Sequence, residues 1–333
     1  MGNLRNILVV IEIKQLRQPA LERGIALYNY AMAHNKKEQR HDDVKIIAVL
    51  PVAQEPWNLT SFLAVDKTQF EKAYKKKQER WLKAYLAVNA MGVKIETKVI
   101  FSREVGKDLV DIAKENCCDI LIKTAEIHGL LDSVISTPLD WQMLRHSAVP
   151  VCIAKDHLWT PSGTIAVAVD LSDPDDEMLR LTNLRLLREA QRLSLFTGCK
   201  IALINAITPI IPPVAVDLPG YTPDSVYDNA LKEGCKRALS FATRHKIAPN
   251  DCHIGEGNLD DVIYDECKKL NPTALFIGTS ARKGIASALI GNICERVSDN
   301  LSCDVVVITP KTVIRNVPTA NPSKSCYERD HVK

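Results

Sequence analysis

Residues 278–292 combine small residues with cations in a pattern that fits a phosphate site. The segment follows an apolar run and leads into a helical pattern. Small residues let backbone N–H groups approach a phosphate, and a helix N-terminus adds unpaired donors and a favourable dipole. The candidate residues here are Gly278, Thr279, Ala281, Arg282, Gly284, Gly291 and Asn292. The alternative is a tight turn in which glycine only supplies a positive φ angle.

The elements that would position this segment occur twice in the chain. Each half opens on an apolar run that ends in an acid, residues 6–12 and 164–170, and closes on another apolar run, residues 150–154 and 304–308. Between them, residues 119–124 resemble residues 274–279, with Ile122 aligned to Ile277. A repeat of this length predicts two copies of one fold, packed about a pseudo-two-fold axis.

Strand and helix patterns alternate in both halves, which predicts an α/β fold. The expected helices cover residues 19–34, 67–91, 105–116, 178–197, 224–245, 259–267 and 287–300. The strands between them are continuous apolar runs, as expected for strands buried on both faces of a parallel sheet. The sequence therefore predicts two tandem doubly wound, flavodoxin- or Rossmann-like domains. In such a fold the ligand lies beyond the carboxyl ends of the strands, where the strand order reverses, and this singles out Asp170 beside Gly278.

The predicted domain boundaries follow from composition. A short polar stretch with Pro and Gly, residues 155–163, separates the repeats. We expect domains at residues 1–156 and 163–310, followed by a flexible polar tail at residues 311–333.

The bulk composition is that of an ordinary soluble protein. The chain has 333 residues and a net charge of only +3, which gives no strong reason to expect nucleic acid or an anionic membrane as the main partner. The lysine-rich run at residues 72–80 is expected to be a solvated helix face, because acids flank it. No apolar stretch is long enough to span a bilayer, and no secretion signal is predicted. The ten cysteines show no paired Cys-x-x-Cys spacing, so we expect reduced thiols and a cytoplasmic location.

With these motifs in view, the chain resembles the universal stress protein superfamily, in its tandem-domain form. The family's nucleotide loop has the pattern Gly-x-x-Gly, nine residues, then Gly-Ser or Gly-Thr. Gly278, Ala281 and Gly291 keep its spacing, and Asp170 matches the acid that follows the first strand. The resemblance covers roughly residues 4 to 310.

This resemblance implies a small-ligand protein that binds ATP or another nucleotide with Mg²⁺. Asp170 would orient the base or ribose, and Gly278, Arg282, Gly291 and Asn292 would face the phosphates. The family also pairs through its closing strands, here residues 151–154 and 305–308. A pseudo-dimer within the chain, and a homodimer of whole chains, are therefore expected.

Two departures from the family pattern affect the loop, and the first half departs further. Ala281 replaces the second glycine, and Asn292 replaces the closing Ser or Thr. In the first half Glu12 replaces the aspartate, Glu126 would repel a phosphate, and residues 136–138 replace the closing motif. We therefore expect the first half to be a structural or differently liganded copy.

Three alternatives to simple nucleotide binding remain open. The ligand could be a nucleotide conjugate or an apolar metabolite that reaches the proline-broken segment 209–219. The protein could be a slow, metal-dependent ATPase, although no general base is visible near the loop. It could also be a scaffold that binds no nucleotide, which Ala281 favours. We expect no catalytic residues and no resident metal site.

Overall fold

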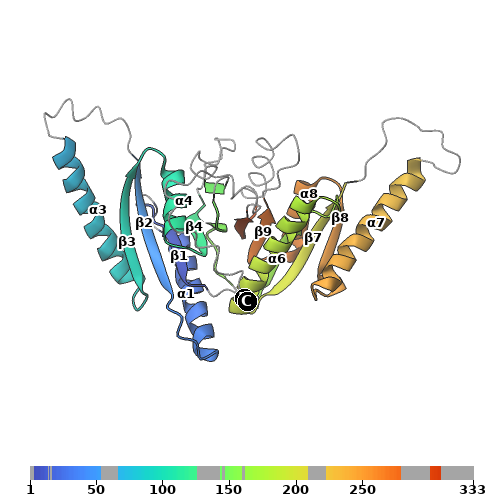
Figure 1. Cartoon of the computed structure of the whole chain (residues 1–333), viewed down its shortest axis with the longest axis horizontal. Coiled ribbons are helices and arrows are strands. Elements are labelled where there is room, and N and C mark those ends of the chain that lie inside the picture. The colour runs from blue at the N-terminus through green and yellow to red at the C-terminus, as the bar shows by residue number, and fades with distance from the viewer. Residues whose placement is uncertain are drawn as a thin grey trace. The chain divides into compact units, whose positions relative to one another are not determined.

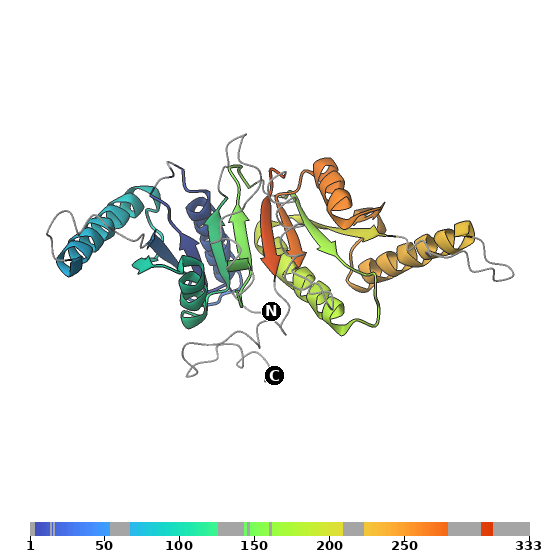
Figure 2. The ribbon, with the colours of Figure 1, turned by 90° about the horizontal axis from the view of Figure 1, so that it is seen from above.

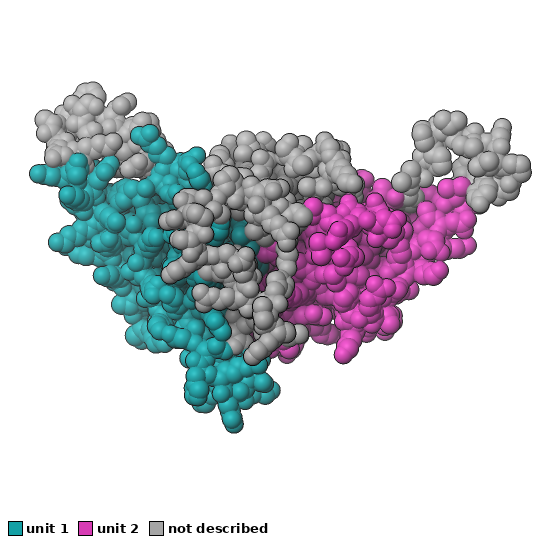
Figure 3. Space-filling view, in the orientation of Figure 1, with its two compact units in different colours: residues 1–127, 136–156, 316–333 teal, residues 128–135, 157–315 magenta. Residues whose placement is uncertain are grey.

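A computed structural model describes most of the chain. The described residues are 4–13, 15, 17–53, 67–125, 143–144, 147–159, 162–208, 223–278 and 301–308. They fall into two compact units, the first ending at Asp156 and the second beginning at His157 (Figure 3). Each unit is described by itself below.

The first unit contains a five-stranded parallel sheet. Its elements are β1 (Asn6–Val10), α1 (Pro19–Lys37), β2 (Lys45–Ala53), α3 (Lys67–Asn89), β3 (Ile95–Ser102), α4 (Val105–Glu115), β4 (Ile120–Thr124) and β5 (Val151–Ala154). The strand order is β3-β2-β1-β4-β5, and all four neighbouring pairs are parallel. This is the doubly wound order that the sequence predicts.

The second unit repeats this arrangement. Its elements are β6 (Thr164–Val169), α6 (Glu177–Thr197), β7 (Lys200–Ile207), α7 (Pro223–Arg244), the short 3-10 helix η1 (Pro249–Asp251), β8 (Cys252–Glu256), α8 (Leu259–Leu270), β9 (Ala274–Gly278) and β10 (Asp304–Ile308). The strand order is β10-β9-β6-β7-β8, again all parallel. Helices α6 and α8 lie on opposite faces of this sheet (Figures 1 and 2).

The strands form the buried core, as their unbroken apolar runs predict. Every residue of β5 and β10 is buried, and β9 is buried up to its last residue. The predicted α/β class with two doubly wound parallel sheets is therefore confirmed. The predicted helix at residues 287–300, the segment 209–219 and the tail 311–333 lie outside the described residues.

Local chemistry explains where α6 begins and ends. The Asp176 carboxylate caps the first turn, because it accepts from the backbone N–H groups of Met178 at 2.7 Å and Leu179 at 3.2 Å. Gly198 ends the helix with a φ of 71°, a left-handed conformation that glycine adopts at little cost. The helix thus starts one residue before the predicted position and ends at the predicted Thr197.

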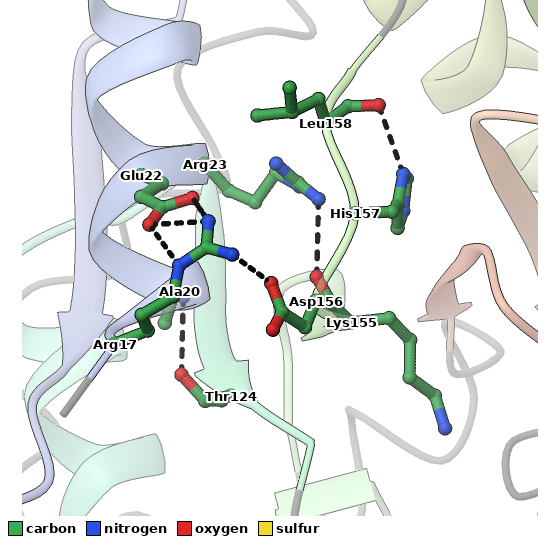
Figure 4. Close-up of polar contacts among 9 residues, drawn as sticks. All are labelled: Arg17, Ala20, Glu22, Arg23, Thr124, Lys155, Asp156, His157 and Leu158. Carbon is green, nitrogen blue, oxygen red and sulfur yellow. Dashed lines mark hydrogen bonds and ion pairs between the residues drawn. The ribbon is translucent and has the colours of Figure 1, made fainter. Parts of the chain in front are cut away.

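Lys155 and Asp156, which lead from the first unit into the second, are bonded to residues of the first unit (Figure 4). Arg17 pairs with Asp156, with 2.5 Å between Nη1 and Oδ1, and is braced by Glu22 at 2.9 Å. Arg23 of α1 donates to the carbonyl oxygen of Lys155 at 3.2 Å.

His157 and Trp159, at the start of the second unit, are bonded to β10 of the same unit. The fully buried Asp304 carboxylate lies 2.9 Å from Nε2 of His157 and accepts from Nε1 of Trp159 at 2.6 Å. A buried carboxylate needs such partners, because an unpaired charge in the interior is very costly.

Seven of the described cysteines are free thiols, in agreement with the expectation of reduced cysteines. Cys117 differs, because it takes part in a disulfide bond, so that expectation is wrong at this residue. Among the helices that the structure describes, none is long and apolar enough to cross a membrane.

Candidate functional site

The candidate site lies where the strand order of the second unit reverses. The chain runs from β6 outward to β7 and β8, and then returns to β9 on the other side of β6. In doubly wound sheets such a reversal leaves a crevice at the carboxyl ends of the two strands, here β6 and β9. Asp170 directly follows β6, and Gly278 is the last residue of β9. Because Val167 pairs with Phe276, these two candidate residues emerge at nearly the same level.

The backbone of Asp170 is held by an amide on α6. Asn183 donates from Nδ2 to the carbonyl oxygen of Asp170 at 2.6 Å, and its Oδ1 accepts from the N–H of Asp170 at 3.0 Å. Asn183 is 3% exposed, so its packing fixes the amide as well. The Asp170 carboxylate accepts from the N–H of Ser172 at 3.0 Å. Together these bonds hold the acid in place at the edge of the sheet. The sequence pattern did not single out Asn183.

The loop from Asp170 to α6 is acidic, and this restricts where a phosphate can bind. Asp173 accepts from the N–H of Asp175 at 3.0 Å, and Asp176 occupies the helix cap. The N-terminal donors of α6 are therefore already partly satisfied by a carboxylate, and a second anion there would meet repulsion. A phosphate at this edge of the sheet would therefore have to lie away from the N-terminus of α6.

Gly278 has a packing role that the sequence did not reveal. A Cβ atom built on this residue would lie 2.6 Å from Cγ2 of Thr182 and 3.4 Å from Cδ1 of Leu186, both on α6. The first distance is shorter than a carbon–carbon contact allows, so α6 packs on β9 only because residue 278 lacks a side chain. Thr182 is itself fixed, because its hydroxyl donates to the carbonyl oxygen of Met178 at 2.8 Å.

A buried amide, Asn205 on β7, is a further polar residue at this edge. It pairs in register with Val169, the residue just before Asp170. Its side chain leaves the sheet on the same face as Ile207, against which α7 packs. Asn205 is 3% exposed, and its Oδ1 atom has no hydrogen-bond partner among the described residues. An unsatisfied buried acceptor costs about 1–3 kcal/mol, so it calls for a donor from outside the described chain.

The remaining candidate residues lie outside the described part of the chain: Thr279, Ala281, Arg282, Gly284, Gly291 and Asn292. The structure thus places two candidates, Asp170 and Gly278, and brings them together. Among the described residues, no group of three or more His, Cys, Asp or Glu side chains is arranged to hold a metal ion.

The first unit offers a direct comparison, once the alignment of the two copies is corrected. Ile7 pairs with Ile120, and Ile165 pairs with Ala274. Ile7 and Ile165 hold the same position in the opening runs of the two halves, so their partners Ile120 and Ala274 also correspond. Counting four residues on from each partner, Thr124 corresponds to Gly278. The sequence alignment, which placed Lys123 there, was therefore off by one residue.

The side-chain contacts support this correction. The hydroxyl of Thr124 accepts from the N–H of Ala20 on α1, just as residue 278 faces the equivalent helix α6. A slip of one residue would have turned Lys123 toward that helix. The equivalent of Lys123 in the second unit is instead the buried Ile277.

In the first unit an ion pair between Lys123 and Glu12 lies at the edge of the sheet that corresponds to the candidate site. Lys123 is fully buried, and its ammonium lies 3.2 Å from Oε1 of Glu12, the counterpart of Asp170. It also donates to the carbonyl oxygen of Thr124 at 3.3 Å, and Gln15 donates to the other oxygen of Glu12. The acid of this copy is thus engaged by a buried lysine, and the equivalent of that lysine in the second unit is the apolar Ile277.

The backbone after the first strand is nevertheless held in the same way in both copies. Gln18, just before α1, donates to the carbonyl oxygen of Glu12 and accepts from its N–H at 3.1 Å. This matches the bonds between Asn183 and Asp170, although the amide comes from a different position. The scaffold of the site is kept in both units, and the side chains at its edge differ.

Two doubly wound units in tandem, each with an amide-held acid at its switch point, define a class of two-domain α/β proteins. Comparison with known proteins narrows that class. The chain belongs to the universal stress protein family, whose model matches residues 3–155 and 162–309.

The relatives are tandem proteins of similar length. The chain is 33% identical over 317 residues to universal stress protein E of Photorhabdus laumondii, which covers 93% of this chain and 96% of the relative. It is 32% identical to universal stress protein E of Escherichia coli, with 93% and 95% covered. A solved structure of a functionally unknown protein from Pseudomonas aeruginosa PAO1 shares the fold, with a TM-score of 0.68 and 22% identity over 94% of this chain and 95% of that one.

Proposed function

We propose that this chain is a cytoplasmic stress-response protein that binds one nucleotide, ATP or a close relative with Mg²⁺, through its second unit. Asp170 orients the base or ribose. The phosphates lie on the β9 side, against the segment that begins at Gly278 and contains Arg282, Gly291 and Asn292. The proposed domains are residues 1–156 and 163–310.

The observation that carries this proposal is the pair of polar groups at the end of neighbouring strands β6 and β7. Asp170 offers a carboxylate that can accept from a ribose hydroxyl. Asn205, one residue back on the next strand, offers a buried acceptor that has no partner in the described part of the chain. An exocyclic amine, such as that of adenine, is a donor of the kind this acceptor lacks. The two groups favour a ligand with both hydroxyl and amine donors.

The asymmetry between the units supports a single site in each chain. In the first unit the equivalent acid is already paired with Lys123 at 3.2 Å. A nucleotide there would have to displace a buried ion pair, and that leaves an uncompensated charge. The first unit is proposed to be structural.

No strong catalysis is proposed, because the described part of the site holds no general base poised near a phosphate. The Mg²⁺ ion would act by neutralising phosphate charge, and its ligands would come largely from the phosphates and water.

Calorimetric titration with Mg·ATP tests the proposal. We compare the wild-type chain with Asp170→Asn and Gly291→Asp, and use Asp173→Asn as the matched control. Asp173 lies in the same loop and accepts from the residue two positions on at the same 3.0 Å distance, but it is not at the switch point. We expect micromolar binding with one site per chain, weakened at least tenfold in the first two variants and unchanged in the control.

Two results would redirect the proposal. An equal loss with Asp173→Asn would mean that the charge of the loop matters and not the position of Asp170. Absence of heat with every protein would exclude ATP, and native mass spectrometry would then identify a co-purified conjugate or apolar metabolite. Phosphate release that stops on chelation would instead favour the slow ATPase.

Pairing of the closing strands β5 and β10, and of whole chains, stays a prediction from the family resemblance. Analytical ultracentrifugation of the wild type against Val306→Lys would test it, because a charge in a buried strand pair is strongly unfavourable.

A further inference from the structure

The outer face of α3 is strongly basic, and the second copy of the fold lacks this property. Six cations occur within residues 72–83, and all six are exposed: Lys72, Lys75, Lys76, Lys77, Arg80 and Lys83. We call them the basic face of α3. Helix α3 packs against β3, at one end of the strand order, and its outer side is turned to solvent (Figure 1).

The cations of the basic face have no ion-pair partner among the described residues. The two acids of α3, Glu71 and Glu79, are less exposed than the cations and form no described ion pair with them. Other helices differ, since α4, α6, α7 and α8 all carry ion pairs between residues three apart. Among the described residues, the cations of α3 thus differ from those of α4, α6, α7 and α8.

This distribution of charge is unfavourable for the isolated helix. Lys72, Lys76 and Arg80 follow one another at intervals of four residues, so like charges lie side by side on one surface. A helix that served only to cover β3 would not need this pattern.

Helix α7 serves as an internal reference, because it holds the same place between β7 and β8 as α3 holds between β2 and β3. It has four basic and three acidic residues, against seven and two in α3. Its Lys236 pairs with Glu233 at 3.6 Å. The scaffold is thus formed equally well by a nearly neutral helix.

We infer that the basic face of α3 binds the phosphate backbone of a nucleic acid. Lys72, Lys76, Arg80 and Lys83 form a row about 16 Å long, which suits a linear polyanion. Trp81 and Tyr85 stack at 5.3 Å on the flank next to Lys77 and offer a half-exposed aromatic surface to bases. The small net charge of the whole chain does not oppose this, because it averages over acids that lie on other elements.

The experiment uses a fluorescein-labelled oligothymidylate and fluorescence anisotropy across a range of salt concentrations. The test variant replaces Lys72, Lys76, Arg80 and Lys83 by glutamine, which has a similar helix propensity. The matched control replaces four exposed cations on or just after α7 by glutamine: Lys232, Lys236, Arg244 and Lys246. A further variant with arginine at the three lysines of the test set keeps the charge.

For single strands the logarithm of affinity falls by about 0.7 per neutralised phosphate for each unit of log salt. Loss of four contacts therefore lowers the slope by about 3, which is roughly a 50-fold difference between 50 and 200 mM salt. We expect this loss only in the α3 glutamine variant. Absence of binding by the wild type, or an equal loss in the α7 control, would overturn the inference.

Two further arms separate this surface from other possible binding sites. Excess Mg·ATP and Asp170→Asn should leave oligonucleotide binding unchanged, and displacement by either would assign the strand to the second-unit site instead. Phosphatidylserine vesicles should bind weakly and be displaced by the oligonucleotide. Tight vesicle binding that the oligonucleotide does not displace would show that the face recognises lipid, which would overturn the inference.

Discussion

Replacing Asn205 by leucine should stabilise the protein without ligand and weaken ligand binding. Leucine has the same branching as asparagine, with two methyl groups in place of the amide oxygen and nitrogen, and carries no unsatisfied acceptor. Since the orphaned Oδ1 atom costs about 1–3 kcal/mol, its removal should raise the free energy of unfolding of the second unit by that amount. For a domain of this size each kcal/mol corresponds to roughly 2–4 °C in Tm. Differential scanning calorimetry without ligand measures the change.

The same substitution should lower nucleotide affinity. A neutral hydrogen bond contributes about 0.5–1.5 kcal/mol, so we expect Kd to rise by roughly two- to tenfold. The protein would then gain stability and lose ligand response, and the increase in Tm on adding Mg·ATP should shrink. Calorimetric titration and the shift in Tm measure the two effects separately.

Asn183 supplies the matched control, because it is equally buried but has its amide fully used. It is also 3% exposed, and it bonds both the N–H and the carbonyl oxygen of Asp170. Asn183→Leu should therefore destabilise the protein by about 1–3 kcal/mol, the opposite sign. Destabilisation by Asn205→Leu of similar size would refute the reasoning, because it would show that the Asn205 acceptor is satisfied in solution.

Three other predictions follow from contacts in the two units. Gly278→Ala should lower the free energy of unfolding by about 1–3 kcal/mol, because the new Cβ would clash with Cγ2 of Thr182. Adding Thr182→Ser, which removes that methyl group but keeps the hydroxyl, should restore the stability measured by chemical denaturation. No rescue would mean that the clash is elsewhere. Lys123→Ile should lower the free energy of urea unfolding by about 2–3 kcal/mol, because it removes the buried partner of Glu12. Adding Glu12→Gln should recover most of this loss. No recovery would show that the two residues are not coupled. Burial, aided by Asp119, raises the pKa of the Cys118 thiol from 9.0 to about 12. The thiol of the unfolded chain therefore ionises first, and the urea midpoint should fall as pH rises from 9 toward 12. The same dependence of the midpoint on pH in Cys118→Ala would contradict this.

The parts of the fold that depend on local pattern could be predicted from the sequence. The unbroken apolar runs predicted buried parallel strands, and periodicity placed the ends of the described helices to within about three residues. Asp170 and Gly278 could be placed at the same edge of the sheet, because the doubly wound order fixes which strand ends meet.

The parts that depend on contacts between distant residues could not be predicted. The alignment of Lys123 with Gly278 relied on similar letters in short strands, whereas strand pairing sets the true register. The ion pair that accompanies the burial of Lys123 could not be predicted, because its partner Glu12 is far away in sequence. Asn205 is a single polar residue in an apolar strand, and nothing in the sequence pattern shows that its Oδ1 atom lacks a partner among the described residues.

The ion pair between Lys123 and Glu12 gives the two halves of the chain different dependences on the contents of the cell. The first half is complete as soon as it folds, because its own lysine fills the place near the acid. The second half, under the proposed function, reaches full stability only when a ligand is present, with a gain of about 2.7 kcal/mol at a hundredfold excess over Kd. Under the proposed function, the lifetime of the protein would therefore follow the supply of a metabolite, because only the second half would depend on a bound ligand for its full stability.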